Sequence, residues 1–335
     1  MPFNPSILRT VSIYLLLAIY PWTVSAQTKQ KIFVPSSLDK SKQPCYIILP
    51  KGHEKSDSQR YPVLVALHTW SSSVEQNNAD WEREAYKRGW IYVFPHFRGP
   101  NNQPAACGSK IAQQDILDAL AYVKSSYQTD NHRIYLAGVS GGGHMTMLMV
   151  SRHPKYWTAA SAWVGISDLA KWHEKHAGTK YGAMLRASCG GIPGSSEAVD
   201  KQYKERSPIN YLKNSIRVPL DIAAGIHDGH LGSVPITHSL EAFNVIANAA
   251  QAKIISEQEM SLLSTPKGRL LAPLTSDKAV DKALGREIHL RRYAAQSRVT
   301  IFEGGHEGIA KAGFDWLARF QTNEHGENIN IERGK

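Results

Sequence analysis

The chain has 335 residues, of which 42% are hydrophobic, and its 39 Lys and Arg against 29 Asp and Glu give a formal charge of +10. This length suffices for one large domain with a well-buried core, and three cysteines are too few for a disulfide-stabilised scaffold. The basic residues are scattered and no motif presents a helix or a stacking surface to nucleic acid, which disfavours that partner. Acidic polysaccharide, an anionic envelope and simple solubility remain as explanations of the charge.

The first 26 residues have the pattern of a secretory signal peptide. Arg9 supplies a positive start, residues 11–20 are apolar, and residues 24–26 form a small-residue cleavage site. The apolar stretch is too short to span a bilayer, and no other segment reaches that length. We therefore expect a secreted or periplasmic protein that begins near Gln27 and has no stable membrane insertion. An uncleaved anchor is the alternative.

Strand-like and helical segments alternate along the rest of the chain. Apolar runs predict strands at residues 46–49, 61–68, 90–94, 133–139, 157–164, 218–224 and 298–302. Helical patterns occur at residues 81–88, 111–127, 144–150, 237–249 and 309–320. This alternation predicts an α/β fold with a mostly parallel sheet covered on both faces, and Trp90, Trp157 and Trp163 are expected in its core.

We expect a single domain over residues 27–322, because the sequence shows no repeat and no second domain. Two insertions interrupt it, a long irregular and lid-like one at residues 168–214 and another at residues 250–290. Residues 323–335 form a polar tail that we expect to fray.

The three cysteines are Cys45, Cys107 and Cys189. One bridge is possible in an oxidising compartment, and Cys107 with Cys189 is the favoured pair because both lie in loop-like stretches. The connectivity itself cannot be deduced from sequence.

Residues 134–144 form an apolar strand that runs into a G-x-S-x-G turn centred on Ser140. A serine hydroxyl acts as a nucleophile only when a base removes its proton and the geometry exposes its oxygen. Gly138 and Gly142 permit the sharp strand-to-helix turn that exposes it, and a helical pattern follows. This context predicts a nucleophile elbow rather than a structural glycine-rich turn.

Among the 14 histidines, His306 has the context expected of the base. It lies in a Gly-Gly-His loop after the last predicted strand and before the closing helix, where the glycines let the imidazole reach the serine. His144, one helical turn past Ser140, is expected to pack instead. His173 and His176 have a spacing that could hold a metal ion, but no third ligand is nearby, so we interpret them as solvated or lid residues. We expect neither a metal nor a cofactor.

The acid that orients the histidine is predicted at Asp228. It ends the strand segment that starts at residue 218, and it gives the chain order serine, acid, histidine. A carboxylate there fixes the imidazole tautomer and stabilises the imidazolium formed during attack. Asp168, which also follows a strand, is the alternative. Asp221 lies within its strand, where an interior role is expected.

Two backbone donors must hold the oxyanion of a tetrahedral intermediate. We expect the amide of Gly141 and, from the loop after the strand at residues 61–68, the amide of Trp70, with Thr69 as the alternative. His68 is expected to shape this loop and is also a candidate substrate contact.

Candidate substrate contacts also include Trp172 in the insert and Arg98 after a strand end. Indole faces, that of Trp70 included, stack on sugar rings, and a guanidinium binds a uronate carboxylate bidentately. Core packing and a structural salt bridge are the respective alternatives.

Together these segments resemble the catalytic domain of the prolyl-oligopeptidase and dienelactone-hydrolase branch of the α/β-hydrolase superfamily. The matching pieces are the strand and loop at His68, the elbow Gly138-Val139-Ser140-Gly141-Gly142, the loop from His227-Asp228-Gly229 to Val234-Pro235, and Gly304-Gly305-His306. They span roughly residues 46–320. The resemblance implies an α/β-hydrolase fold with a Ser140, Asp228 and His306 triad at the carboxyl edge of the sheet, but it does not define a substrate.

Peptidases of this type usually carry a large β-propeller, and only about 20 residues separate the expected cleavage site from the strand near Tyr46. A compact basic chain is more similar to the secreted esterases that remove acetyl, methyl or feruloyl groups from plant cell-wall polysaccharide. We expect such a serine esterase, acting on a polysaccharide or oligosaccharide ester such as pectin. An aminopeptidase-like enzyme without a propeller, which acidic lid residues such as Glu174 would favour, and an inactive binding module are the alternatives. The oligomeric state is not predicted.

Overall fold

The structure is a computed structural model that describes Met1, residues 29–53 and residues 58–331. Apart from Met1, the expected signal peptide at residues 1–26 lies outside the described residues. Within the described part of the chain, no helix is both long and apolar enough to cross a bilayer. The thiols of Cys45, Cys107 and Cys189 are free and buried.

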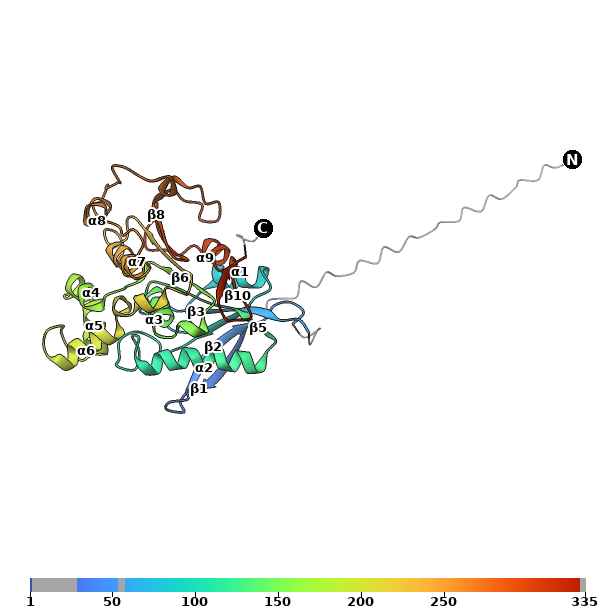
Figure 1. Cartoon of the computed structure of the whole chain (residues 1–335). Helices are drawn as coiled ribbons and strands as arrows, with labels where there is room; N and C mark the ends of the chain where they lie inside the picture. Colours follow the sequence, from blue (N-terminus) through green and yellow to red (C-terminus); the bar gives the residue numbers. More distant parts are fainter. Residues whose placement is uncertain (2–28, 54–57, 332–335) are drawn as a thin grey trace.

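One large sheet of nine strands organises the molecule, in the order β1-β2-β4-β3-β5-β6-β7-β9-β8 (Figure 1). The strands are β1 (Lys29–Pro35), β2 (Lys42–Ile48), β3 (Tyr61–Leu67), β4 (Ile91–Pro95), β5 (Thr129–Val139), β6 (Ala159–Trp163), β7 (Leu220–Gly225), β8 (Ile288–Ala294) and β9 (Ser297–Phe302). The pairs from β4 through β3, β5, β6 and β7 to β9 are parallel, whereas β1–β2, β2–β4 and β8–β9 are antiparallel. The predicted α/β fold with a mostly parallel sheet is confirmed.

Helices cover both faces of this sheet. They are α1 (Ala79–Lys87), α2 (Lys110–Ser126), α3 (Gly141–Arg152), α4 (Leu169–His176), α5 (Lys180–Cys189), α6 (Glu197–Arg206), α7 (Thr237–Ala249), α8 (Glu257–Leu263) and α9 (Ala310–Leu317). Helices α1 and α9 pack against each other through Trp81 and Phe314, whose ring centroids lie 5.7 Å apart. Helices α2 and α3 lie on the opposite face (Figure 1).

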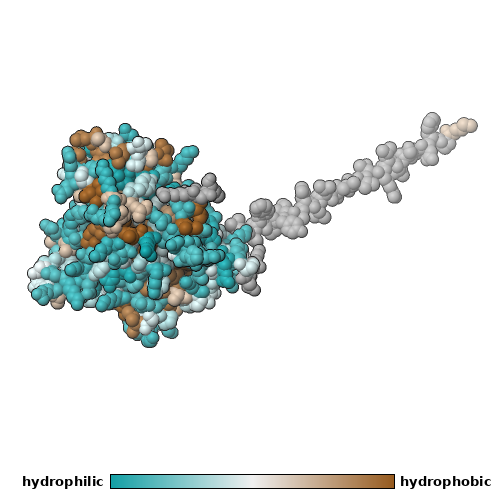
Figure 2. Space-filling model, in the orientation of Figure 1, coloured by the Kyte–Doolittle hydropathy of each residue, from teal (hydrophilic) through white to brown (hydrophobic). Residues whose placement is uncertain are grey.

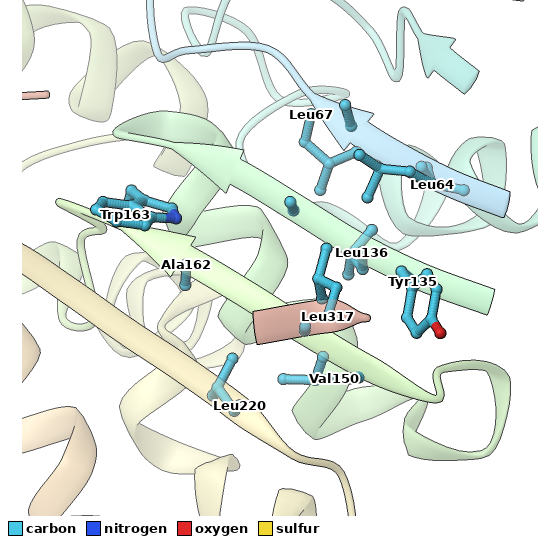
Figure 3. Close-up of a cluster of buried hydrophobic side chains, with 14 of the residues drawn as sticks. Leu64, Leu67, Tyr135, Leu136, Val150, Ala162, Trp163, Leu220 and Leu317 are labelled. Carbon is cyan, nitrogen blue, oxygen red and sulfur yellow. The ribbon is translucent and has the colours of Figure 1, made fainter. Parts of the chain in front are cut away.

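The core lies between the central parallel strands and these helices, as Figure 3 shows for Leu64, Leu136 and Leu317. All seven residues of β3 are buried, because a parallel strand covered on both faces has no solvent side. Trp90, Trp157 and Trp163 are buried in the core as expected.

The interior role expected for Asp221 is also found. On β7 its carboxylate pairs with Arg298 of β9, with 2.7 Å between Oδ1 and Nε, and both residues are buried. The two charges satisfy each other inside the sheet, so Asp221 is not available at the edge where catalysis is expected.

Several segments are more regular than the sequence reading expected. The insertion at residues 168–214 contains α4, α5 and α6, whose N-termini are capped by the side chains of Asp168, Thr179 and Ser196. The tail does not fray up to Ile331, because β10 (Phe320–Thr322) and β11 (Asn328–Asn330) form an antiparallel pair. The last four residues of the tail lie outside the described part.

The surface seen in Figure 2 is mainly hydrophilic, with hydrophobic side chains gathered at the end that α8 and β8 occupy in Figure 1. Exposed Leu271, Leu274 and Val280 belong to the chain between these two elements. These three side chains do not line the depression beside His306.

Candidate active site

Ser140 lies at the turn between β5 and α3, in a backbone conformation with φ 59° and ψ −117°. A positive φ is strained for any residue other than glycine and persists only where the surroundings impose it. Here the Ser140 amide donates to the carbonyl of Trp163 at 2.8 Å. A Cβ on Gly138 would lie 2.4 Å from the backbone of Gly142, and one on Gly142 would lie 2.2 Å from the carbonyl oxygen of Leu67. The glycine spacing of the motif is therefore dictated by backbone packing.

Asp228 and His306 come together in the loops that follow the neighbouring strands β7 and β9. The Nδ1 atom of His306 lies 2.7 Å from Oδ2 of Asp228. The other oxygen, Oδ1, accepts hydrogen bonds from the amides of Gly229 at 2.9 Å and Val234 at 3.0 Å. Because a carboxylate only accepts, Nδ1 of His306 carries the proton and Nε2 is left as the base.

Close backbone packing holds these two loops in place. The amide of His227 donates to the carbonyl of Gly304 at 3.0 Å. A Cβ on Gly232 would lie 2.2 Å from Oδ1 of Asp228, so the chain after Asp228 closes tightly over its carboxylate. The carboxylate is buried, whereas about a quarter of the His306 side chain is exposed.

The two expected oxyanion donors are also brought together. A Cβ on Gly141 would lie 2.4 Å from the amide nitrogen of Trp70, so the backbone of the elbow directly contacts the backbone of the loop after β3. Gly141 is the first residue of α3, where amides have no partner within the helix. The alternative donor, the amide of Thr69, is occupied by Oε1 of Gln76 at 2.8 Å. The geometry favours the pair Gly141 and Trp70.

The alternative acid Asp168 and the histidine nearest to Ser140 in the sequence, His144, have structural roles. Asp168 caps α4 by accepting from the amides of Ala170 and Lys171. His144 is buried, which lowers its pKa to about 4, and its Nε2 lies 2.8 Å from the carbonyl of Arg206. His173 and His176 belong to the insert, as expected for lid residues, but both are buried, so their interpretation as solvated residues is wrong. The described residues contain no cluster of three or more His, Cys, Asp or Glu side chains arranged to hold a metal ion.

The structure contradicts the prediction that Arg98 and Trp172 are available to contact a substrate. The guanidinium of Arg98 binds Asp39 at 2.7 Å and Asp115 at 2.5 Å, so its charge is already paired. Trp172 is 1% exposed, and its Nε1 donates to the carbonyl of Ser233 at 2.9 Å. Trp70, whose ring packs edge-on against Trp172, is equally enclosed, so neither indole presents a face to a sugar.

His68 is likewise no substrate contact, and only its expected role in shaping the loop is supported. Its ring is completely buried, stacks on Phe97 with 3.8 Å between centroids, and places Nε2 2.8 Å from the carbonyl of His96. Burial lowers the pKa of His68 to about 4. The neutral ring connects the loop after β3 to the loop after β4.

An open depression of about 520 Å³ lies beside His306 and is formed largely by residues that the sequence reading did not single out. Its lining consists of His176, Thr179, Lys180, Tyr181, Leu231, Gly232, Ser233 and His306. Lys180 and Tyr181 begin α5, and Leu231 is 88% exposed. The sequence signals that could have suggested them are the place of Lys180 and Tyr181 in the lid-like insertion and the place of Leu231 just after Asp228.

The sequence analysis also did not predict a group of three charged or titratable side chains beside the triad, Glu303, His227 and His289, which we call the brace. Glu303, just before the Gly-Gly-His loop, lies 2.5 Å from Nε2 of His227 and 2.9 Å from Nε2 of His289. The hydrogen bond with His227 is the main reason why the pKa of Glu303 is lowered. Because His227 precedes Asp228 directly, the brace connects the loop of the acid to the loop of the base.

Fold and site together define a serine hydrolase of the α/β-hydrolase fold. Residues 77–257 match the sequence profile of the prolyl oligopeptidase family, and the chain belongs to this family.

Curated relatives carry the names of both esterases and peptidases. The chain is 23% identical over 215 residues to feruloyl esterase B of Talaromyces stipitatus, covering 62% of this chain and 53% of the relative. It is 28% identical over 155 residues to the uncharacterized peptidase YtmA of Bacillus subtilis, covering 45% of this chain and 56% of the relative. The chain thus spans about half the length of these two proteins.

Among solved structures, an acylaminoacyl peptidase of Pyrococcus horikoshii superposes with a TM-score of 0.57 at 19% identity. The match covers 70% of this chain and 37% of that chain. At this identity the likeness shows a shared fold and does not extend to substrate.

Proposed function

We propose that the protein is a carboxylic ester hydrolase that acts on acyl or methyl esters of acidic plant cell-wall polysaccharide. The observation that carries this proposal is the charge of the depression beside His306. Lys180 is its one permanently charged lining residue, and no Asp or Glu is among the described residues that line it. Lys180 is exposed, and its ammonium lies 5.2 Å from the centroid of the ring of Tyr181, which also lines the depression. A positive charge at this place favours a substrate that carries carboxylates.

The same charge argues against an aminopeptidase. Such an enzyme must bind the ammonium group of its substrate, which requires a carboxylate near the nucleophile. Asp168 is committed to the cap of α4, and Glu174 is exposed but does not line the depression. Glu303 and Glu307, on either side of His306, are paired with His227 and Arg286 and do not line it either. The feruloyl esterases among the relatives support an ester substrate, and the basic composition and the expected signal peptide support a secreted enzyme.

The proposed mechanism is a two-step acyl transfer. Nε2 of His306 removes the hydroxyl proton of Ser140, whose oxygen attacks the ester carbonyl, while the amides of Gly141 and Trp70 hold the oxyanion. The imidazolium, stabilised by Asp228, then protonates the leaving alcohol. Water, activated by the same histidine, releases the acid and restores the serine.

The proposal is tested by measuring released products. Pectin, acetylated xylan and a feruloylated arabinoxylan oligosaccharide are incubated with the enzyme beside a panel of aminoacyl 4-nitroanilides. We expect acetate, methanol or ferulate from the polysaccharides and no nitroaniline. Release of nitroaniline without any of these products would establish a peptidase and overturn the proposal.

The role of Lys180 is tested by replacing it with alanine. We expect KM for a partly methyl-esterified oligogalacturonide to rise about fivefold, which corresponds to about 1 kcal/mol, an ordinary value for one exposed ion pair. The kcat/KM for neutral 4-nitrophenyl acetate should not change. Lys253→Ala, at an exposed position outside the depression, is the matched control. An equal loss on both esters, or no change on either, would contradict this role.

A further inference from the structure

A second hydrophobic cluster, separate from the main core, connects the insert to the loop that carries the oxyanion donor. Trp70 and Trp172 belong to it, and so do Cys107 and Cys189. Cys107 lies in the loop between β4 and α2, and Cys189 is the last residue of α5. The two cysteines therefore belong to one buried cluster, Cys189 on the side of the insert and Cys107 on the side of the body of the domain.

Hydrogen bonds on both sides hold this junction together. The Cys107 amide donates to Oδ1 of Asn101 at 2.7 Å, and the hydroxyl of Ser188 donates to the carbonyl of Asn101 at 3.0 Å. The amide of Asn101 in turn donates to the carbonyl of Trp70 at 2.9 Å. A constraint at the cysteines is thus transmitted to the backbone of the oxyanion loop through one residue.

The two thiols are buried in this same cluster, and each changes the pKa of the other. Burial raises the pKa of the Cys107 thiol, but Cys189 and the nearby Arg206 lower it by more, so it lies below its ordinary value. The neighbouring Cys107 and burial raise the pKa of Cys189. Of the two thiols, Cys107 therefore has the lower pKa and forms more readily the thiolate that attacks in thiol–disulfide exchange.

We propose that Cys107 and Cys189 form a disulfide bond when the protein matures in an oxidising compartment, and that this bond fastens α5 to the loop before α2. Each thiol gives up one proton and one electron, and the two sulfurs bond. The oxidant is a disulfide of the thiol-oxidase or oxidised-glutathione class, which is reduced to two thiols. The bond closes a loop of about 80 residues.

The proposal is tested on the full chain, exported to the bacterial periplasm or refolded in a glutathione redox buffer. Thiols are counted with Ellman's reagent after denaturation, and a non-reduced digest is analysed by mass spectrometry. We expect a single free thiol, that of Cys45, and a linked pair of peptides containing Cys107 and Cys189. Three free thiols, or a bond that includes Cys45, would overturn the proposal.

The fastening effect is measured by thermal unfolding with and without reductant. Oxidised wild-type protein should melt about 5 °C higher than reduced protein, because the bond restricts the unfolded chain. The double variant Cys107→Ser with Cys189→Ser should lose this difference, whereas Cys45→Ser should keep it. An equal Tm for oxidised and reduced wild-type protein would show that the bond does not fasten the insert. Thiol counts and melting do not depend on the substrate, so these results are independent of the proposed esterase activity.

Discussion

Replacing Ser140 with alanine is expected to lower kcat for 4-nitrophenyl acetate by about 10⁴-fold or more. The hydroxyl at the elbow supplies the attacking oxygen, and the oxyanion donors alone leave only a small residual rate. Alanine is the informative choice because it keeps the Cβ, and with it the strained backbone at φ 59°. Glycine would relieve that strain and change stability together with activity.

Two further measurements make the Ser140→Ala result specific. A sulfonyl fluoride should attach to the wild-type protein at the peptide that contains Ser140 and leave the variant unmodified. Ser71→Ala, which removes an exposed hydroxyl one residue after Trp70, should keep wild-type kcat and serves as the matched control. If the Ser140 variant retains activity within tenfold of wild type, with unchanged thermal unfolding, another residue is the nucleophile.

The residues predicted as the triad follow from local patterns. The elbow needs glycines where two backbones approach, and the Gly-Gly-His and His-Asp-Gly sequences mark loops directly after buried strands. The structure brings Asp228 and His306 into hydrogen-bond contact and places Gly141 against Trp70. Such loops can be recognised because neighbouring residues determine both their conformation and the strand before them.

Substrate contacts could not be predicted in the same way, because burial and pairing depend on residues far away in the sequence. The partners of Arg98 are Asp39 and Asp115, and the sequence around Arg98 does not indicate that it pairs with either of them. Trp172 is buried, and its indole nitrogen donates a hydrogen bond to the carbonyl of Ser233, 61 residues further along the chain. The residue type alone therefore does not show whether a side chain is exposed or buried.

The edges of the sheet were missed for a related reason. Strand β8 contains Arg291 and Arg292, which interrupt its apolar pattern, yet both are buried because Asp281 and Asp277 pair with them. Charged residues in a strand look like a solvated loop until their partners are known. The N-caps of the insert, by contrast, are local signals. Asp168, Thr179 and Ser196 could have indicated where α4, α5 and α6 begin.

Replacing Asp228 with asparagine is expected to lower kcat/KM by about 10⁴-fold without unfolding the protein. The amides of Gly229 and Val234 both donate to Oδ1, so the asparagine oxygen must occupy that position. Its NH₂ group then faces Nδ1 of His306, which can only accept. The proton moves to Nε2, and the imidazole no longer has a lone pair toward Ser140.

This substitution separates the acid from its alternative, Asp168. Asp168→Asn should leave kcat/KM nearly unchanged, because an asparagine oxygen can cap α4 as the carboxylate does. Both variants are assayed on 4-nitrophenyl acetate beside thermal unfolding curves, so that a loss of fold is distinguished from a loss of chemistry. A large loss at Asp168 with full activity at Asp228 would move the acid to the loop after β6. We expect the loss at Asp228 instead. The amides of Gly229 and Val234 hold its Oδ1, and this fixes its Oδ2 where it accepts from Nδ1 of His306.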